Sequence, residues 1–180
     1  MYPFISKRTS SPKPINFIML IDQNITIKYL ADVPEVSHAI AEWYYNEWGA
    51  HDENITREYM HEIVLQKIGN KDQIPLSLVL FVDEKLAGVA ELKYRENKNF
   101  PEYTHWLGGI FIASTFRGLG LSSKLIQSAK TVAQALDVQN LYLQAEPMNI
   151  ALYEKHGFKK LHTADHFGIK TTIMMINLNQ

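Results

Sequence analysis

Residues 110–122 of the chain read Ile110-Phe111-Ile112-Ala113-Ser114-Thr115-Phe116-Arg117-Gly118-Leu119-Gly120-Leu121-Ser122. The first part of this stretch is apolar and β-branched, which favours a strand. After the glycines, apolar residues recur every three or four positions, which predicts a long amphipathic helix. The expected buried stripe of that helix consists of Leu121, Leu125, Ile126, Ala129, Val132, Ala133 and Leu136. The stretch therefore predicts a strand, a glycine turn and a helix.

The glycine turn, residues 117–120, has the chemistry of a phosphate-binding site. The first turn of a helix exposes unpaired N–H groups and carries about +0.5 of an elementary charge. Glycines let an anion approach the backbone closely, and Arg117 adds bidentate donors. The spacing of a Walker loop is absent. A dinucleotide fingerprint would place the turn after the first strand of a parallel unit, with a third glycine where Ser123 stands. A lone Gly-x-Gly turn also fits an ordinary helix start.

The segments before the turn predict a strand, two helices and a meander. The expected strands cover 25–30, 76–82, 86–94 and 106–113, and the expected helices run from Asp32 to Trp48 and from Thr56 to Ile68. Asp32 is the expected N-cap of the first helix, and Tyr59 belongs to the expected buried stripe of the second. The paired Gly108 and Gly109 in a strand indicate a bulge or a close backbone approach by a ligand.

After the long helix, the pattern predicts a strand over 140–144, a short helix over 147–156, and strands over 158–163 and 170–177. The fold class is therefore α/β (α+β), with a mostly antiparallel mixed sheet flanked by helices. The pair His162 and His166 falls at a strand end and the loop after it, where a four-residue spacing does not converge on a metal.

Bulk properties limit the classes of function. A chain of 180 residues with 46% apolar and 21% charged residues fits one domain, and a net charge of -1 argues against a general nucleic-acid binder. No apolar run reaches the length of a membrane span. The absence of cysteine excludes disulfides and fits a reducing compartment, so we expect a cytoplasmic protein. We expect a flexible tail over residues 1–18 and one domain over 19–180.

A second block adds to the glycine turn. Residues 151–158 read Ala-Leu-Tyr-Glu-Lys-His-Gly-Phe. Together, the two blocks and the distance between them are similar to the GNAT superfamily of N-acetyltransferases, in which Arg-x-x-Gly-x-Gly/Ala follows a bulged strand and Leu-Tyr-Glu-x-x-Gly-Phe comes later. The chain departs from this pattern at Ser114 (usually proline), Ser122 (usually glycine or alanine) and Glu146 (often asparagine).

The resemblance implies a sheet that splays between its fourth and fifth strands, with acetyl-CoA as cosubstrate in the opening and no metal. It implies that strand residues Ile110, Phe111 and Ile112 pair with the pantetheine arm, and that an N–H near Ile112 polarises the thioester carbonyl. The pyrophosphate would lie on the turn. The residues implied there are Arg117, Gly118, Leu119, Gly120, Leu121, Ser122 and Ser123.

The resemblance also implies a general acid, Tyr153, that protonates the leaving thiolate. The base has no fixed position in the family, so Glu91, His105 and Glu146 are candidates, and Gln144 stands where some relatives carry a glutamate. An alkylamine is only about one part in 10³ neutral near pH 7, which is why a base matters.

The acceptor pocket is expected on the first helix. Trp43, Tyr44 and Trp48 lie near Glu42 and Glu47, and aromatics with carboxylates suit a cationic amine. We therefore expect a small-molecule or peptide amine as the substrate, and neither a nucleic acid nor a membrane as a partner. The sequence is compatible with a homodimer. A catalytically silent domain that senses acetyl-CoA is the alternative function, and a dinucleotide-dependent oxidoreductase is disfavoured by the position of the turn.

Overall fold

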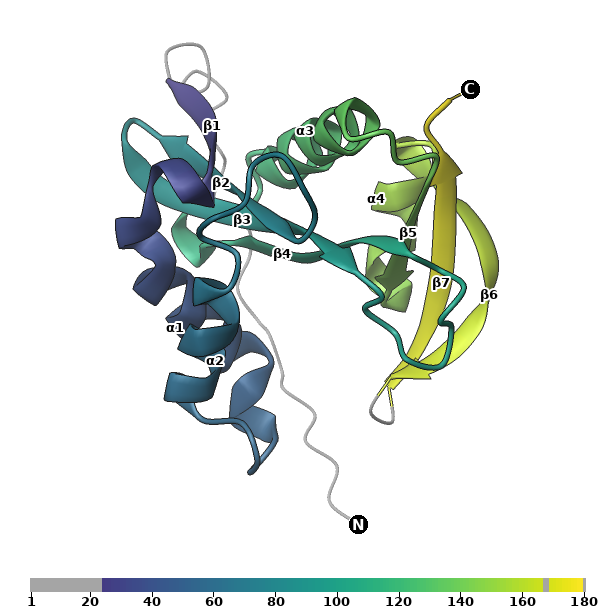
Figure 1. The fold of residues 1–180 in the computed structure, drawn as a ribbon, viewed down its shortest axis with the longest axis horizontal. Helices are drawn as coiled ribbons and strands as arrows, with labels where there is room; N and C mark the ends of the chain where they lie inside the picture. Colours follow the sequence, from purple (N-terminus) through teal and green to yellow (C-terminus); the bar gives the residue numbers. More distant parts are fainter. Residues whose placement is uncertain (1–23, 167–168, 180) are drawn as a thin grey trace, which may run out of the picture.

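The computed structural model describes residues 24–166 and 169–179, so the tail expected over residues 1–18 lies outside the described part. The strands are β1 Ile25–Tyr29, β2 Leu76–Val82, β3 Lys85–Tyr94, β4 His105–Ile112, β5 Asn140–Ala145, β6 Lys159–His166 and β7 Ile169–Asn177. The α-helices are α1 Ser37–Glu47, α2 Arg57–Leu65, α3 Leu121–Ala135 and α4 Ile150–Lys155. The strands form one sheet in the order β1-β2-β3-β4-β5-β7-β6 (Figure 1).

Helices cover both faces of this sheet (Figure 1). The alternation of side chains along β2 shows why both faces are buried. Leu78 and Leu80 pack into the core under α3, whereas Val79 and Phe81 pack into a second core under α1 and α2. In α3, Leu125 and Ile126 of the expected stripe are 0% exposed, and burial of each such side chain contributes about 1.5–3 kcal/mol.

The sheet opens between β4 and β5. These two strands are the parallel pair, and their register has only two partners, His105 with Leu141 and Trp106 with Tyr142. Beyond Trp106, β4 continues without β5 beside it, so its free edge and the start of α3 border an opening. The expected splay between the fourth and fifth strands is confirmed.

β4 carries a bulge at the paired glycines. Val89 of β3 is opposite Phe111, and Glu91 is opposite Gly108. The single residue Ala90 of β3 therefore lies opposite two residues of β4, Gly109 and Ile110. Gly109 has φ +55°, in the left-handed region that glycine adopts without steric cost. The expected bulge is therefore confirmed at this position.

The start of the first helix was predicted wrongly. Two short 3-10 turns, Leu30–Asp32 and Pro34–Val36, precede α1, which begins at Ser37 with no side-chain cap. Val33 between them has φ −140° and ψ 55°, outside the helical region, so a helix capped by Asp32 cannot continue through it. The second helix begins where it was expected, after Thr56, whose side chain caps it by accepting a hydrogen bond from the N–H of Tyr59.

The burial of one side chain and the boundaries of two elements also differ from the prediction. Tyr59 is 48% exposed and does not belong to a buried stripe. The stretch expected as one short helix after β5 begins with a 3-10 turn, Pro147–Asn149, before α4. β6 extends to His166, so His162 and His166 both lie on one strand; four residues on a strand span about 13 Å, too far for one metal ion. Within residues 24–166 and 169–179, no helix is long and apolar enough to cross a membrane.

Candidate active site

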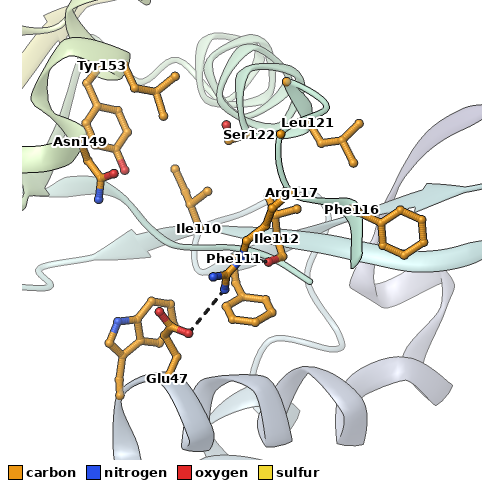
Figure 2. A pocket seen from close by; sticks show the side chains of 14 residues that line it. Glu47, Ile110, Phe111, Ile112, Phe116, Arg117, Leu121, Ser122, Asn149 and Tyr153 are labelled. Carbon is orange, nitrogen blue, oxygen red and sulfur yellow. Dashed lines mark hydrogen bonds and ion pairs between the residues drawn. The ribbon is translucent and has the colours of Figure 1, made fainter. Parts of the chain in front are cut away.

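A pocket of about 260 Å³ lies where the free edge of β4 meets the start of α3. Four segments line it: β4, the glycine turn with the start of α3, the start of α4, and the end of α1 (Figure 2). The sequence-predicted residues that line it are Trp48, Ile110, Phe111, Ile112, Arg117, Gly118, Gly120, Leu121, Ser122 and Tyr153. The structure therefore brings the two sequence blocks together around one cavity.

The start of α3 is open to a ligand. Gly120 is the N-cap, with φ +72° and no side-chain cap bond, so among the residues that the structure describes no side chain caps the first N–H groups of the helix. Gly118 has φ +82°, and a Cβ added at Gly118 or Gly120 would meet no atom within 4 Å. This combination of free donors, helix dipole and open space fits a pyrophosphate.

Arg117 lies beside this turn and folds back over β4. Its Nε donates to the carbonyl of Ile112 at 2.9 Å, and its guanidinium lies 5.5 Å from the centre of the Phe111 ring. One guanidinium nitrogen is 3.6 Å from a carboxylate oxygen of Glu47, at the end of α1 (Figure 2). The side chain is half-exposed, so this ion pair is solvated and easily exchanged for another anion.

Tyr153 points into the pocket from α4, beside Asn149 (Figure 2). Burial raises the pKa of Tyr153 to about 12, and the charges of Glu96 and Glu146 add to the rise. A phenol with this pKa stays protonated at neutral pH and can donate a proton to a group in the pocket.

The bulge in β4 is held from the α1 side. The hydroxyl of Tyr44 donates a hydrogen bond of 2.8 Å to the carbonyl of Gly109, and Tyr44 is 4% exposed. A Cβ on Gly109 would lie 2.7 Å from this hydroxyl, so only glycine fits there. Burial, together with the charge of Glu91, raises the pKa of Tyr44 well above its usual value.

Glu91 is 1% exposed and lies outside the pocket lining. Its carboxylate is 2.7 Å from the ammonium of Lys67 and 3.6 Å from that of Lys93. Burial alone would raise the pKa of Glu91, but the two ammonium groups outweigh it and lower the pKa. A carboxylate stabilised in this way is a weak base, so its contacts favour a structural role.

The remaining predicted residues do not line the pocket. His105 lies at the start of β4 beside Tyr94, and burial lowers its pKa. Glu146 precedes the 3-10 turn before α4, and its charge adds to the rise in the pKa of Tyr153. Trp43 stacks on Phe111 at 5.0 Å. Leu119 packs against the core, and the N–H of Ser123 bonds to the carbonyl of Gly120 at 3.2 Å.

The structure also places residues in the pocket that the sequence reasoning missed. These are Phe116, Asn149 and Leu152, whereas Glu47, which also lines the pocket, was already named beside the expected acceptor pocket. Asn149 lies four residues before Tyr153, so a one-turn helical spacing could have indicated it. No comparable signal pairs Glu47 with Arg117, because the two are far apart in the sequence. Among the described residues, no group of three His, Asp or Glu side chains could hold a metal ion.

Comparisons with known proteins agree with this architecture. A family model described as "Acetyltransferase (GNAT) family" matches residues 34–158. No curated protein matches the chain. Solved structures with a similar fold include a GNAT acetyltransferase from Streptococcus pneumoniae, with 20% identity and a TM-score of 0.63 over 86% of this chain and 99% of that one.

Two other similar structures were determined with a coenzyme. A putative acetyltransferase from Salmonella typhimurium with its cofactor acetyl-CoA has 19% identity and a TM-score of 0.68, over 86% of this chain and 94% of that one. An aminoglycoside 6'-N-acetyltransferase complexed with coenzyme A has 11% identity and a TM-score of 0.66, over 85% and 97%. Because the family model spans more than half of the 180 residues, the chain belongs to the Acetyltransferase (GNAT) family.

Proposed function

We propose that this protein is an acetyl-CoA-dependent N-acetyltransferase that transfers the acetyl group to a primary amine by direct attack in a ternary complex. One observation carries the proposal. The phenol of Tyr153, the uncapped start of α3 and the free edge of β4 line the same pocket. These are the three elements that a thioester attached to a long phosphorylated arm requires: a proton donor, an anion site and free backbone groups.

The coenzyme contacts follow from this arrangement. The pyrophosphate lies on the N–H groups at the start of α3, where Gly118 and Gly120 leave space. The pantetheine amides pair with β4 over residues 110–112, along the edge that β5 leaves free. At the bulge, the N–H of Ile110 is the donor for the thioester carbonyl, two residues earlier in β4 than the sequence indicated.

The reaction needs three proton movements, because the acceptor arrives as an ammonium and first loses one proton to solvent to become a neutral amine. The neutral amine nitrogen forms a bond with the acetyl carbon, and the bond between that carbon and sulfur breaks. The hydroxyl of Tyr153 gives its proton to the sulfur as the thiolate leaves. The attacking nitrogen loses its proton to solvent, because Glu91 is held by Lys67 and His105 lies away from the pocket.

The acceptor approaches from the side of α1. Trp48, at the C-terminal end of this helix, is 45% exposed and lines the pocket, as does Glu47. Trp43 and Tyr44, expected in the same role, are used for packing and for the bulge. An aromatic ring beside a carboxylate suits a cationic amine, whether it belongs to a small molecule or a peptide.

A panel of primary amines, with release of free coenzyme A as the readout, tests the proposal. Tyr153→Phe should retain acetyl-CoA affinity in calorimetry and lose at least about a hundredfold in kcat, the usual contribution of a general acid. Tyr59→Phe is the matched control because Tyr59 is exposed on α2, outside the pocket lining. Tight acetyl-CoA binding without turnover across the panel would instead identify a sensor domain.

A further inference from the structure

The loop between β3 and β4, residues 95–104, covers the face of the sheet that carries α1 and α2. Leu107 of β4 and Leu143 of β5 belong to the core under α3. Their neighbours Gly108 and Gln144 therefore lie on the opposite face. The loop is fixed there, because Asn97, 5% exposed, donates to Gln144 at 2.8 Å. Tyr103 stacks on Tyr142 of β5 at 4.3 Å.

Glu96 is the carboxylate that this loop packs against β4 just beyond Trp106, where the pairing with β5 ends, and it lies outside the pocket lining. The two oxygens of Glu96 lie 2.6 and 3.1 Å from the position of a Cβ on Gly108. Gly108 thus leaves the space that the carboxylate fills, one residue before the bulge. Oε1 accepts a hydrogen bond from Lys93 at 2.9 Å, and Oε2 has no hydrogen-bond partner among the described residues.

Resting on the function proposed above, we propose that Glu96 binds the ammonium group of the acceptor, which makes the acceptor a cationic primary amine. The free Oε2 accepts hydrogen bonds from the N–H groups of the substrate's ammonium, and the ion pair with Lys93 holds Oε1 in place. The site lies on the α1 and α2 face, whereas α3, with its anion site, lies on the other. The two substrates therefore meet at the bulge from opposite faces of the sheet.

The other carboxylates near the opening do not offer this arrangement. Glu91 is 1% exposed, and its carboxylate already forms ion pairs with Lys67 and Lys93. Glu47 lies on the path by which the acceptor approaches, but its carboxylate is paired with Arg117 beside the glycine turn. Glu96 is the carboxylate whose charge raises the pKa values of both Tyr44 and Tyr153, in agreement with its contact to Gly108 beside the bulge.

Two coenzyme A conjugates test this assignment without knowledge of the natural acceptor. S-(2-aminoethyl)-coenzyme A places an ammonium group beside the sulfur, and S-propyl-coenzyme A has the same length without the charge. The wild-type protein should bind the aminoethyl conjugate about tenfold more tightly in calorimetry, as expected for a charged hydrogen bond. Glu96→Gln should remove this preference and leave the affinity for the propyl conjugate unchanged.

Glu102→Gln is the matched control, because Glu102 is exposed on the same loop and the change in charge is identical. It should keep the tenfold preference. For an amine that is turned over, Glu96→Gln should raise KM much more than it lowers kcat. A wild-type protein without the preference, or a Glu96→Gln variant that retains it, would overturn the assignment. If neither conjugate binds, the proposed coenzyme function itself fails.

Discussion

The hydroxyl of Tyr44 in α1 lies 2.8 Å from the carbonyl oxygen of Gly109 in β4 and donates a hydrogen bond to it. The C=O and N–H of a trans peptide point in opposite directions. A Gly109 carbonyl drawn toward Tyr44 therefore directs the N–H of Ile110 away from α1. In this way a helix on the acceptor side sets the orientation of the N–H that we assign to the thioester carbonyl.

Removal of this hydrogen bond should affect turnover more than coenzyme binding. We expect Tyr44→Phe to lower kcat roughly tenfold and the free energy of unfolding by about 1 kcal/mol, because the half-buried Gly109 carbonyl loses its donor and the Glu91 carboxylate loses a polar neighbour. Coenzyme release assays and urea unfolding measure the two effects. Tyr45→Phe, at the neighbouring position on α1, is the control. A variant that loses stability while kcat stays unchanged would mean that the bond serves folding alone.

Removal of one partner of the buried pair Lys67 and Glu91 should lower the free energy of unfolding more than replacement of both by apolar residues. Lys67→Met leaves the Glu91 carboxylate with Lys93 at 3.6 Å and the hydroxyl of Tyr44 as its remaining partners, and the expected loss is about 3–5 kcal/mol. Lys67→Met combined with Glu91→Leu should recover much of that loss, because no buried charge then lacks its main partner. Urea unfolding of the single and double variants gives the coupling energy. Additive losses would contradict the assignment of a coupled pair.

The same cluster predicts a loss of stability in acid. The pKa of Glu91 is lower in the folded protein than in the unfolded chain. Its contribution is therefore present above the unfolded pKa of about 4.3 and is lost as the pH falls through the folded pKa. The free energy of unfolding should decrease below about pH 5. Glu91→Gln should show a shallower decrease over this range, and an unchanged slope would contradict the role of Glu91.

The sequence predicted the elements that depend on local pattern, and it failed where distant segments meet. The periodicity of residues 121–136 and the turn residues around it specify α3 directly. The bulge could be predicted because Gly108 and Gly109 break an apolar strand. By contrast, nothing in the sequence places Glu96 on Gly108 or Tyr44 on Gly109, since these contacts follow from the packing of a loop and a helix on the sheet.

Gly120 should tolerate neither a side chain nor a charge. Its φ of +72° makes any L-residue strained, so Gly120→Ala should lower stability by about 1–2 kcal/mol. Gly120→Asp adds a carboxylate beside the phosphate site, and its Kd for acetyl-CoA should rise about thirtyfold, or 2 kcal/mol. Calorimetry with both variants separates strain from charge. Equal affinities for the two would mean that the pyrophosphate does not lie on this turn.

The ion pair between Glu47 and Arg117 should compete with the coenzyme. The pair is 3.6 Å long, and both side chains are about half-exposed, so it contributes at most about 1 kcal/mol. Glu47→Gln should lower the Kd for acetyl-CoA by about twofold to fivefold, because Arg117 is then free for the pyrophosphate.

The double variant decides whether the effect passes through Arg117. Arg117→Ala alone should raise the Kd, and Glu47→Gln in that background should have no further effect, because its partner is gone. The gain from Glu47→Gln should also shrink at high salt, where a solvated pair is already screened. If Glu47→Gln has the same effect with and without Arg117, then Glu47 acts on the coenzyme directly as a nearby negative charge.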